Sequence, residues 1–81
     1  MSIRILFFAS LADITGTRET EVDSALFSDV SSVFERFVRE FPALAAHRSS
    51  LMCAVNQEFA GSNARVHDGD EIAFFPPVSG G

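Results

Sequence analysis

Residues 29–41 hold the feature that most limits how this chain can fold. Their apolar side chains recur at the spacing i, i+3, i+4, i+7, i+8 and i+11, and are Val30, Val33, Phe34, Phe37, Val38 and Phe41. This spacing places them on one broad face of an amphipathic helix. Asp29 or Ser28 can cap the start of the helix, and Pro42 ends it by disfavouring helical geometry at the preceding residue. The broad apolar face predicts that the helix packs against a sheet.

The segments on both sides of this helix alternate as strands do. Residues 2–8 place Ile3, Ile5 and Phe7 on one face, whereas Arg4, Leu6 and Phe8 take the other. Further strands are predicted at 17–22, 51–56, 57–60 (a short one) and 71–75. Residues 9–16 are predicted as a connection closing at Gly16, and residues 43–50 as a second connection.

The order strand, strand, helix, strand, short strand, strand defines the expected fold class. One helix can fill only one face of a mixed sheet of four to five strands, which predicts an α+β layer. The first and last strands are both strongly apolar, as central strands are, so we expect them side by side and parallel. This is the β-grasp, or ubiquitin-like, arrangement. We expect residues 1–75 to form this domain and residues 76–81 to form a flexible C-terminal tail.

Composition excludes several classes of function. The net charge is −5 and no basic run occurs, which argues against nucleic acid and anionic membranes as partners. All six basic residues are Arg, so the chain has no lysine for Schiff-base chemistry or for acyl acceptance. The one cysteine, Cys53, cannot form an internal disulfide, which fits a reducing, cytoplasmic compartment. No apolar run is long enough to span a bilayer.

The side chains offer no convincing catalytic or metal site. His47 and His67 are not accompanied by a ligand pattern that would bind a metal, so we expect no metal. The acidic cluster at residues 68–71 lacks the calcium-loop pattern and predicts a turn at Asp68-Gly69. Cys53 lies in an apolar strand and is interpreted as an inert buried thiol. We therefore expect no enzyme on its own and no intrinsically bound cofactor.

The remaining reactive group is the carboxylate of Gly81, which ends the tail Pro76, Pro77, Val78, Ser79, Gly80 and Gly81. The two prolines end the last strand and stiffen its exit. Six extended residues reach roughly 20 Å. Gly80 and Gly81 lack a Cβ, so they can pass through a narrow channel. The pattern predicts a tail that delivers its carboxylate to a partner, which must activate it before it can react.

An aromatic patch is predicted at the root of this tail. Phe8 and Phe75, joined by Phe59 if the short strand presents it on the same face, point away from the helix if the alternation holds, and Phe8 and Phe75 would be neighbours on adjacent strands. Exposed aromatic side chains in a cluster are typical of protein-docking surfaces. The alternative is a second small core under residues 57–66.

The chain resembles, almost end to end, the small sulfur-carrying subunits of molybdopterin synthase. The resemblance lies in the opening Ile-Arg-Ile-Leu-Phe-Phe-Ala, in Ala54–Gln57, and in residues 68–81, where Phe-Phe-Pro-Pro-Val-Ser-Gly-Gly is the most specific part. Relatives often carry Arg-Glu where this chain has Ala12-Asp13. The charged pair that relatives could use for a partner contact from that loop is therefore replaced in this chain.

The resemblance implies a reaction cycle with two partners. An E1-like enzyme uses ATP to adenylate Gly81, and sulfur then replaces AMP to give a thiocarboxylate. The tail next enters the catalytic large subunit, within a heterotetramer, and donates sulfur to cyclic pyranopterin monophosphate in molybdenum cofactor synthesis. Apolar residues matching Phe8, Phe59 and Phe75 contact partners in this family. Two alternatives stay open: a carrier for another pathway, such as thiamin synthesis, and a ubiquitin-like protein modifier.

Overall fold

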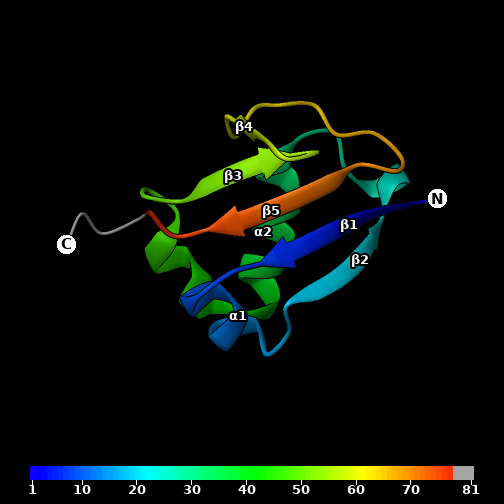
Figure 1. The fold of residues 1–81 in the computed structure, drawn as a ribbon. Helices are drawn as coiled ribbons and strands as arrows, with labels where there is room; N and C mark the ends of the chain where they lie inside the picture. The colour runs from blue at the N-terminus through cyan, green and yellow to red at the C-terminus, as the bar shows by residue number, and fades with distance from the viewer. Residues whose placement is uncertain (78–81) are drawn as a thin grey trace.

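A twisted sheet and one long helix form the framework of residues 1–77, the part of the chain that this computed structural model describes (Figure 1). The strands are β1 (Ser2–Phe7), β2 (Glu19–Asp23), β3 (Met52–Val55), β4 (Glu58–Ala60) and β5 (Glu71–Phe75). The α-helices are α1 (Ser10–Thr15) and α2 (Val30–Glu40), and the 3₁₀ turns are η1 (Ser24–Leu26) and η2 (Pro42–His47).

The sheet has the order β2-β1-β5-β3-β4, with β1 and β5 parallel at its centre and the other neighbours antiparallel. The predicted parallel pairing of the first and last strands is therefore confirmed. In this register Ile5 lies opposite Ile72, and Phe7 lies opposite Phe74. All four side chains are at most 2% exposed, so the central strand pair supplies one continuous apolar face.

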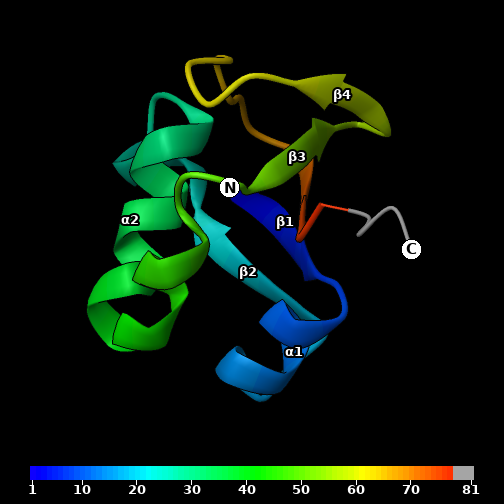
Figure 2. The ribbon, with the colours of Figure 1, turned by 90° about the vertical axis from the view of Figure 1, so that its left-hand side faces the viewer.

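Helix α2 packs on that face of the sheet and does not cover the opposite face (Figure 2). Asp29 caps the helix: its side chain accepts a bond from the Ser32 backbone N–H at 2.8 Å, and the Ser32 hydroxyl accepts one from the Asp29 N–H at 3.3 Å. The ring of Phe37 packs edge-on against Phe7, with centroids 5.1 Å apart. The helix predicted from the apolar repeat is thus confirmed, with Asp29 as its cap.

The hydrophobic core is formed by side chains from the three central strands, both α-helices, η2 and the segment before β5. Its buried members are Ile3, Ile5, Phe7, Leu11, Val30, Val33, Phe34, Phe37, Leu44, Cys53, Val66, Ile72 and Phe74. Within residues 1–77, no helix combines the length and the apolar character that crossing a membrane requires.

The segment predicted as a plain connection, residues 9–16, contains helix α1. Leu11 is fully buried in the core, and the Thr15 hydroxyl donates to the Leu11 carbonyl at 3.0 Å. The helix ends at Gly16, whose φ of 74° lies in the left-handed region that glycine adopts readily. Strand β2 consequently begins two residues later than the predicted 17–22. A helix of six residues is too short for an apolar repeat to be recognised.

The turn between β3 and β4 places two residues other than glycine in the left-handed region. Asn56 has φ 52° and Gln57 has φ 71°, as in the type I′ turns that favour glycine in the second position. We expect Gln57→Gly to raise the free energy of unfolding by about 0.5–1 kcal/mol, because it removes the steric cost of a Cβ at this φ. Urea denaturation measures the change. Gln57→Ala keeps the Cβ and is expected to give no such gain, so an equal gain in both variants would contradict this explanation.

Candidate functional site

The candidate site lies where the two central strands end. Because β1 and β5 are parallel, their carboxyl ends meet at the same edge of the sheet. Phe8 directly follows β1 and Phe75 is the last residue of β5. The Phe8 backbone N–H donates to the Phe74 carbonyl at 3.1 Å, which fixes the residue after β1 to the end of β5. Pro76 and Pro77 then carry the chain away from the sheet.

Three phenylalanine rings, from Phe8, Phe59 and Phe75, form what we call the aromatic patch. The ring of Phe75 lies between the other two, with its centroid 6.3 Å from Phe8 and 5.8 Å from Phe59, and both pairs meet edge-to-face. Phe8 is 49% exposed and Phe59 is 76% exposed. Such exposure does not fit the alternative of a small core under residues 57–66. The structure brings together the three rings that the alternation indicated; their role in partner binding stays a prediction.

The sequence reasoning did not single out Met52, which extends the patch. Met52 lies directly opposite Phe75 in the β3–β5 register and is 37% exposed. Residues directly opposite each other project from the same face of a sheet, so Met52 shares the outer face with Phe75. The signal was present in the sequence: if Cys53 faces the core, its neighbour Met52 faces outward.

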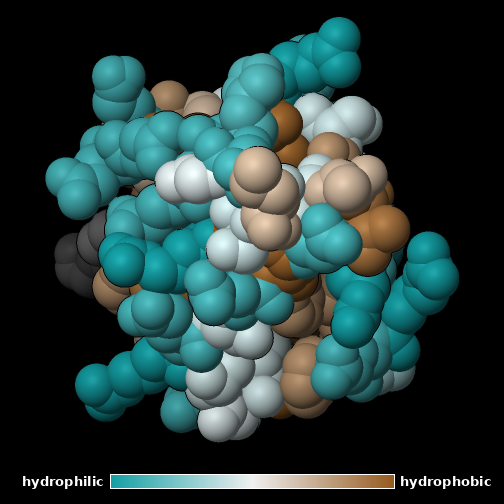
Figure 3. All heavy atoms as spheres, turned by 90° about the vertical axis from the view of Figure 1, so that its right-hand side faces the viewer, coloured by the Kyte–Doolittle hydropathy of each residue, from teal (hydrophilic) through white to brown (hydrophobic). Residues whose placement is uncertain are grey.

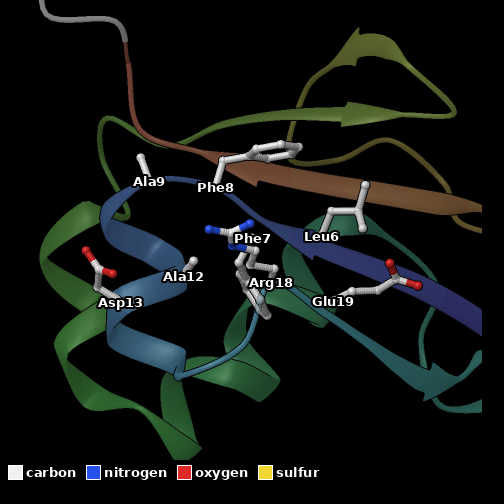
Figure 4. A pocket seen from close by; sticks show the side chains of 8 residues that line it. All are labelled: Leu6, Phe7, Phe8, Ala9, Ala12, Asp13, Arg18 and Glu19. Atoms are coloured by element: carbon white, nitrogen blue, oxygen red, sulfur yellow. The ribbon is translucent and has the colours of Figure 1, made fainter.

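A surface hollow of about 450 Å³ adjoins the aromatic patch, with Phe8 in its wall (Figure 4). Leu6, Ala9 and Ala12 supply apolar lining, whereas Asp13, Arg18 and Glu19 supply charge. Figure 4 shows Arg18 reaching from the segment before β2 into the space between α1 and Phe8. Ala12 and Asp13, the positions that depart from the relatives' Arg-Glu, therefore lie on α1 at the edge of the patch.

The predicted delivery tail is described only in part. Pro76 is half-buried and Pro77 is exposed directly after β5. Val78, Ser79, Gly80 and Gly81 lie outside the described residues, so the chemistry assigned to Gly81 and the boundary between domain and tail stay predictions.

Two other side chains considered as reactive groups do not reach the aromatic patch, because Cys53 faces the core and His67 lies at the other end of β5. Cys53 is 6% exposed and its thiol donates to the Ala60 carbonyl at 3.0 Å; burial raises the pKa of this thiol. A buried thiol with a raised pKa is a poor nucleophile. His67 lies 3.7 Å from a carboxylate oxygen of Asp70 at the opposite end of β5. Among residues 1–77, no three His, Cys, Asp or Glu side chains gather where they could hold a metal ion.

The class of protein follows from the sheet and the site together. A mixed sheet with parallel terminal strands, an amphipathic helix on one face and a chain that leaves from the central strand define a ubiquitin-like β-grasp protein, as predicted. A family model described as the ThiS family matches residues 5–81. The chain belongs to this family.

Curated relatives agree with the resemblance seen in the sequence. The molybdopterin synthase sulfur carrier subunit of Escherichia coli K12 is 41% identical to this chain, over 98% of this chain and 99% of its own length. The protein of the same name from Haemophilus influenzae is 35% identical, over 98% and 99%. The predicted kinship with these subunits is confirmed.

Solved structures share the fold. SAMP1 of Haloferax volcanii, a small archaeal modifier protein, superposes with a TM-score of 0.81 at 32% identity, and the match covers 100% of both chains. A chain from the complex of subunits 1 and 2 of the molybdopterin-converting factor of Helicobacter pylori superposes with a TM-score of 0.67 at 22% identity, again over 100% of both chains. At 22% identity, the likeness to the Helicobacter pylori chain shows a shared fold alone.

Proposed function

We propose that this chain is the sulfur carrier subunit of a molybdopterin synthase. A partner enzyme adenylates the carboxylate of Gly81 with ATP, and a sulfur donor displaces AMP to leave a thiocarboxylate. The large subunit then receives the tail, and the sulfur passes to cyclic pyranopterin monophosphate. In this transfer the thiocarboxylate sulfur bonds to a carbon of the precursor in place of an oxygen substituent. Water then cleaves the acyl C–S bond, which leaves the sulfur on the precursor and returns the carboxylate of Gly81 for the next cycle. The chain supplies a reactive terminus, and its partners supply the catalysis.

The observation that carries this proposal is the position of the aromatic patch at the end of β5. Phe75 is the last residue of that strand, and two residues of fixed φ follow it directly. A partner that binds the patch therefore receives the tail at a defined starting point. The match to the ThiS family also continues through residue 81, so it includes the two glycines.

The chemistry of the terminus explains why partners are needed. A C-terminal carboxylate has an ordinary pKa of about 3.3–3.7, so it is ionised at neutral pH and is a poor acyl donor. Adenylation converts it into a mixed anhydride with a good leaving group. The absence of lysine from the sequence means that no side-chain amine of the carrier itself competes for the activated acyl group. The activating step consumes ATP, which the cytoplasm supplies, so the proposed function places the protein in the cytoplasm.

The aromatic patch is the proposed docking surface for the large subunit and for the E1-like activating enzyme. Its centre is apolar, and Asp13, Arg18 and Glu19 of the adjoining hollow give it a charged rim. An apolar centre with a polar rim is the usual anatomy of a protein interface. In the complex of subunits 1 and 2 of the molybdopterin-converting factor of Helicobacter pylori, a chain of this fold assembles with the other subunit, which supports a subunit partner for this chain as well.

Mass spectrometry of the C-terminus tests the proposal. The protein is incubated with an E1-like enzyme, ATP and a sulfur source, and the C-terminal peptide is then measured intact. We expect one oxygen of Gly81 to be replaced by sulfur, and we expect omission of ATP to prevent the change. If the terminus stays a carboxylate while the same enzyme loads a known carrier, the proposal is wrong.

A protein modifier is the second candidate function, and the likeness to SAMP1 at 32% identity favours it. In this case the activated Gly81 forms isopeptide bonds to lysines of other proteins. Because the sequence has no lysine, the chain could not build polymers on itself. Affinity purification separates the candidates: many covalent conjugates without a large synthase subunit would favour the modifier. Recovery of that subunit without conjugates would favour the carrier.

A further inference from the structure

The side chain of Asn56 joins the β3–β4 hairpin to the start of β5. Its amide nitrogen donates to Asp70 at 3.0 Å, and its amide oxygen accepts the Glu71 backbone N–H at 3.0 Å. The Asn56 backbone N–H also donates to the Glu71 carbonyl at 2.7 Å. The first residue of a two-residue turn is thereby held by three hydrogen bonds, one to Asp70 directly before β5 and two to Glu71, the first residue of β5.

Asp70, the acceptor in this arrangement, is itself held in place. One of its carboxylate oxygens accepts the His67 backbone N–H at 2.7 Å, and its own N–H donates to the His67 carbonyl at 3.0 Å. Burial acts to raise the pKa of Asp70, but the hydrogen bonds from Asn56 and His67 outweigh it and lower the pKa. Hydrogen bonds therefore orient the carboxylate toward Asn56, and the lowered pKa favours its ionised form, which is the better acceptor.

The hairpin tip contributes to the position of Phe59, together with the pairing of β3 with β4 and β5 and the ring contact with Phe75. Strand β4 has three residues and pairs only with β3 within the described sheet, where it forms the edge. Phe59 lies opposite Ala54, two residues from Asn56 along β3. The turn at residues 56–57 and the start of β5 share one end of the sheet (Figure 1). Figure 3, which views that end, shows a largely hydrophilic surface with some hydrophobic side chains. The bond between Asn56 and Asp70 is exposed.

We propose that Asn56 is a positioning residue for the aromatic patch: by fixing the β3–β4 hairpin to β5 it holds the exposed ring of Phe59 against Phe75. The inference rests on the proposed function in one respect, namely that partners bind the patch. Asn56 itself lies at the other end of β5 and need not touch a partner.

Exchanging the two side chains tests this role. Asn56→Asp places two carboxylates against each other, which breaks the bond to Asp70 and adds repulsion. In the double variant Asn56→Asp with Asp70→Asn, the amide at position 70 donates to the carboxylate at position 56, and its oxygen still accepts the His67 N–H. Asn63→Asp is the matched control, because it makes the same chemical change in the loop after β4.

Two readouts are needed, nuclear Overhauser contacts between the rings of Phe59 and Phe75 and the Kd for the large subunit. For Asn56→Asp we expect weaker ring contacts and a Kd raised about tenfold, as the loss of one charge-assisted bond implies. The double variant should regain both, and Asn63→Asp should change neither. Thermal unfolding of each variant establishes that the compared proteins are folded.

The outcomes separate this inference from the proposed function. Unchanged ring contacts in Asn56→Asp, or no recovery in the double variant, would overturn the positioning role. Ring contacts that are lost and regained while the Kd stays constant would support the positioning role and overturn the docking role of the patch. Neither result depends on sulfur loading at Gly81, which mass spectrometry tests separately.

Discussion

Replacing Gly81 with valine is expected to lower sulfur transfer by at least about 100-fold while the protein still folds. Under the proposed function the carboxylate oxygen of residue 81 attacks the α-phosphate of ATP and displaces pyrophosphate, and sulfur then displaces AMP at the carbonyl carbon. A branched side chain beside it displaces this atom, and a displacement of about 1 Å costs on the order of 100-fold in rate. The buried core extends from Ile3 to Phe74, so a change at residue 81 leaves it intact. Sulfur delivered to the precursor by the reconstituted synthase is the quantity to measure.

Two measurements identify which step Gly81→Val affects. The Kd for the large subunit should stay within a few-fold of the unmodified protein, because the aromatic patch is unchanged. The rate of adenylation, followed by release of pyrophosphate, should fall with the rate of sulfur transfer. A Gly81→Val protein that is fully active in sulfur transfer would show that the terminus is not the reactive centre.

The sequence was sufficient for the fold because its local and long-range signals agree. The helical repeat at residues 29–41 needs a sheet to cover, and the apolar strands at both ends of the chain need a central position in one. Ile5 and Ile72 lie more than sixty residues apart in sequence and are direct neighbours in the sheet. The topology that satisfies both demands is the one observed.

What the sequence did not predict depends on contacts between distant or short segments. The helical spacing places Glu35 one turn from Arg39 on the solvent-exposed face of α2. In the structure Glu35 instead forms two bonds of 2.7 Å with Arg48, and these bonds lower the pKa of Glu35. Helix α1 is specified by the burial of Leu11 rather than by a periodic pattern. The bond from Asn56 to Asp70 requires the β3–β5 register, which no local rule supplies.

The candidate site was partly predictable for a physical reason. Side chains alternate across a strand, so the burial of Phe7 and Phe74 requires their neighbours Phe8 and Phe75 to face outward. The direction of Phe59 does not follow from this alternation, because β4 is a three-residue edge strand whose orientation depends on its turn. The aromatic patch thus combines two rings specified by the central strands with a third specified by the hairpin.

Phe59→Ala is expected to weaken binding of the large subunit by about 30- to 1000-fold, with little change in stability. Aromatic side chains at the centre of an interface typically contribute about 2–4 kcal/mol, which corresponds to that range of Kd. Phe59 is 76% exposed in the free protein, so its removal costs the fold less than about 1 kcal/mol, mainly through the lost ring contact with Phe75. Isothermal titration with the purified large subunit measures the Kd, and urea denaturation measures the stability.

Leu26→Ala is the matched control for Phe59→Ala. Leu26 is 72% exposed and lies in η1, directly after the strand whose Asp23 pairs with Ser2. It therefore lies near the start of β1, whereas the aromatic patch lies at the end of that strand. Removing this equally exposed apolar side chain should leave the Kd within about twofold, as surface changes away from an interface do. Equal weakening by both substitutions would mean that general surface hydrophobicity, and not the aromatic patch, determines binding.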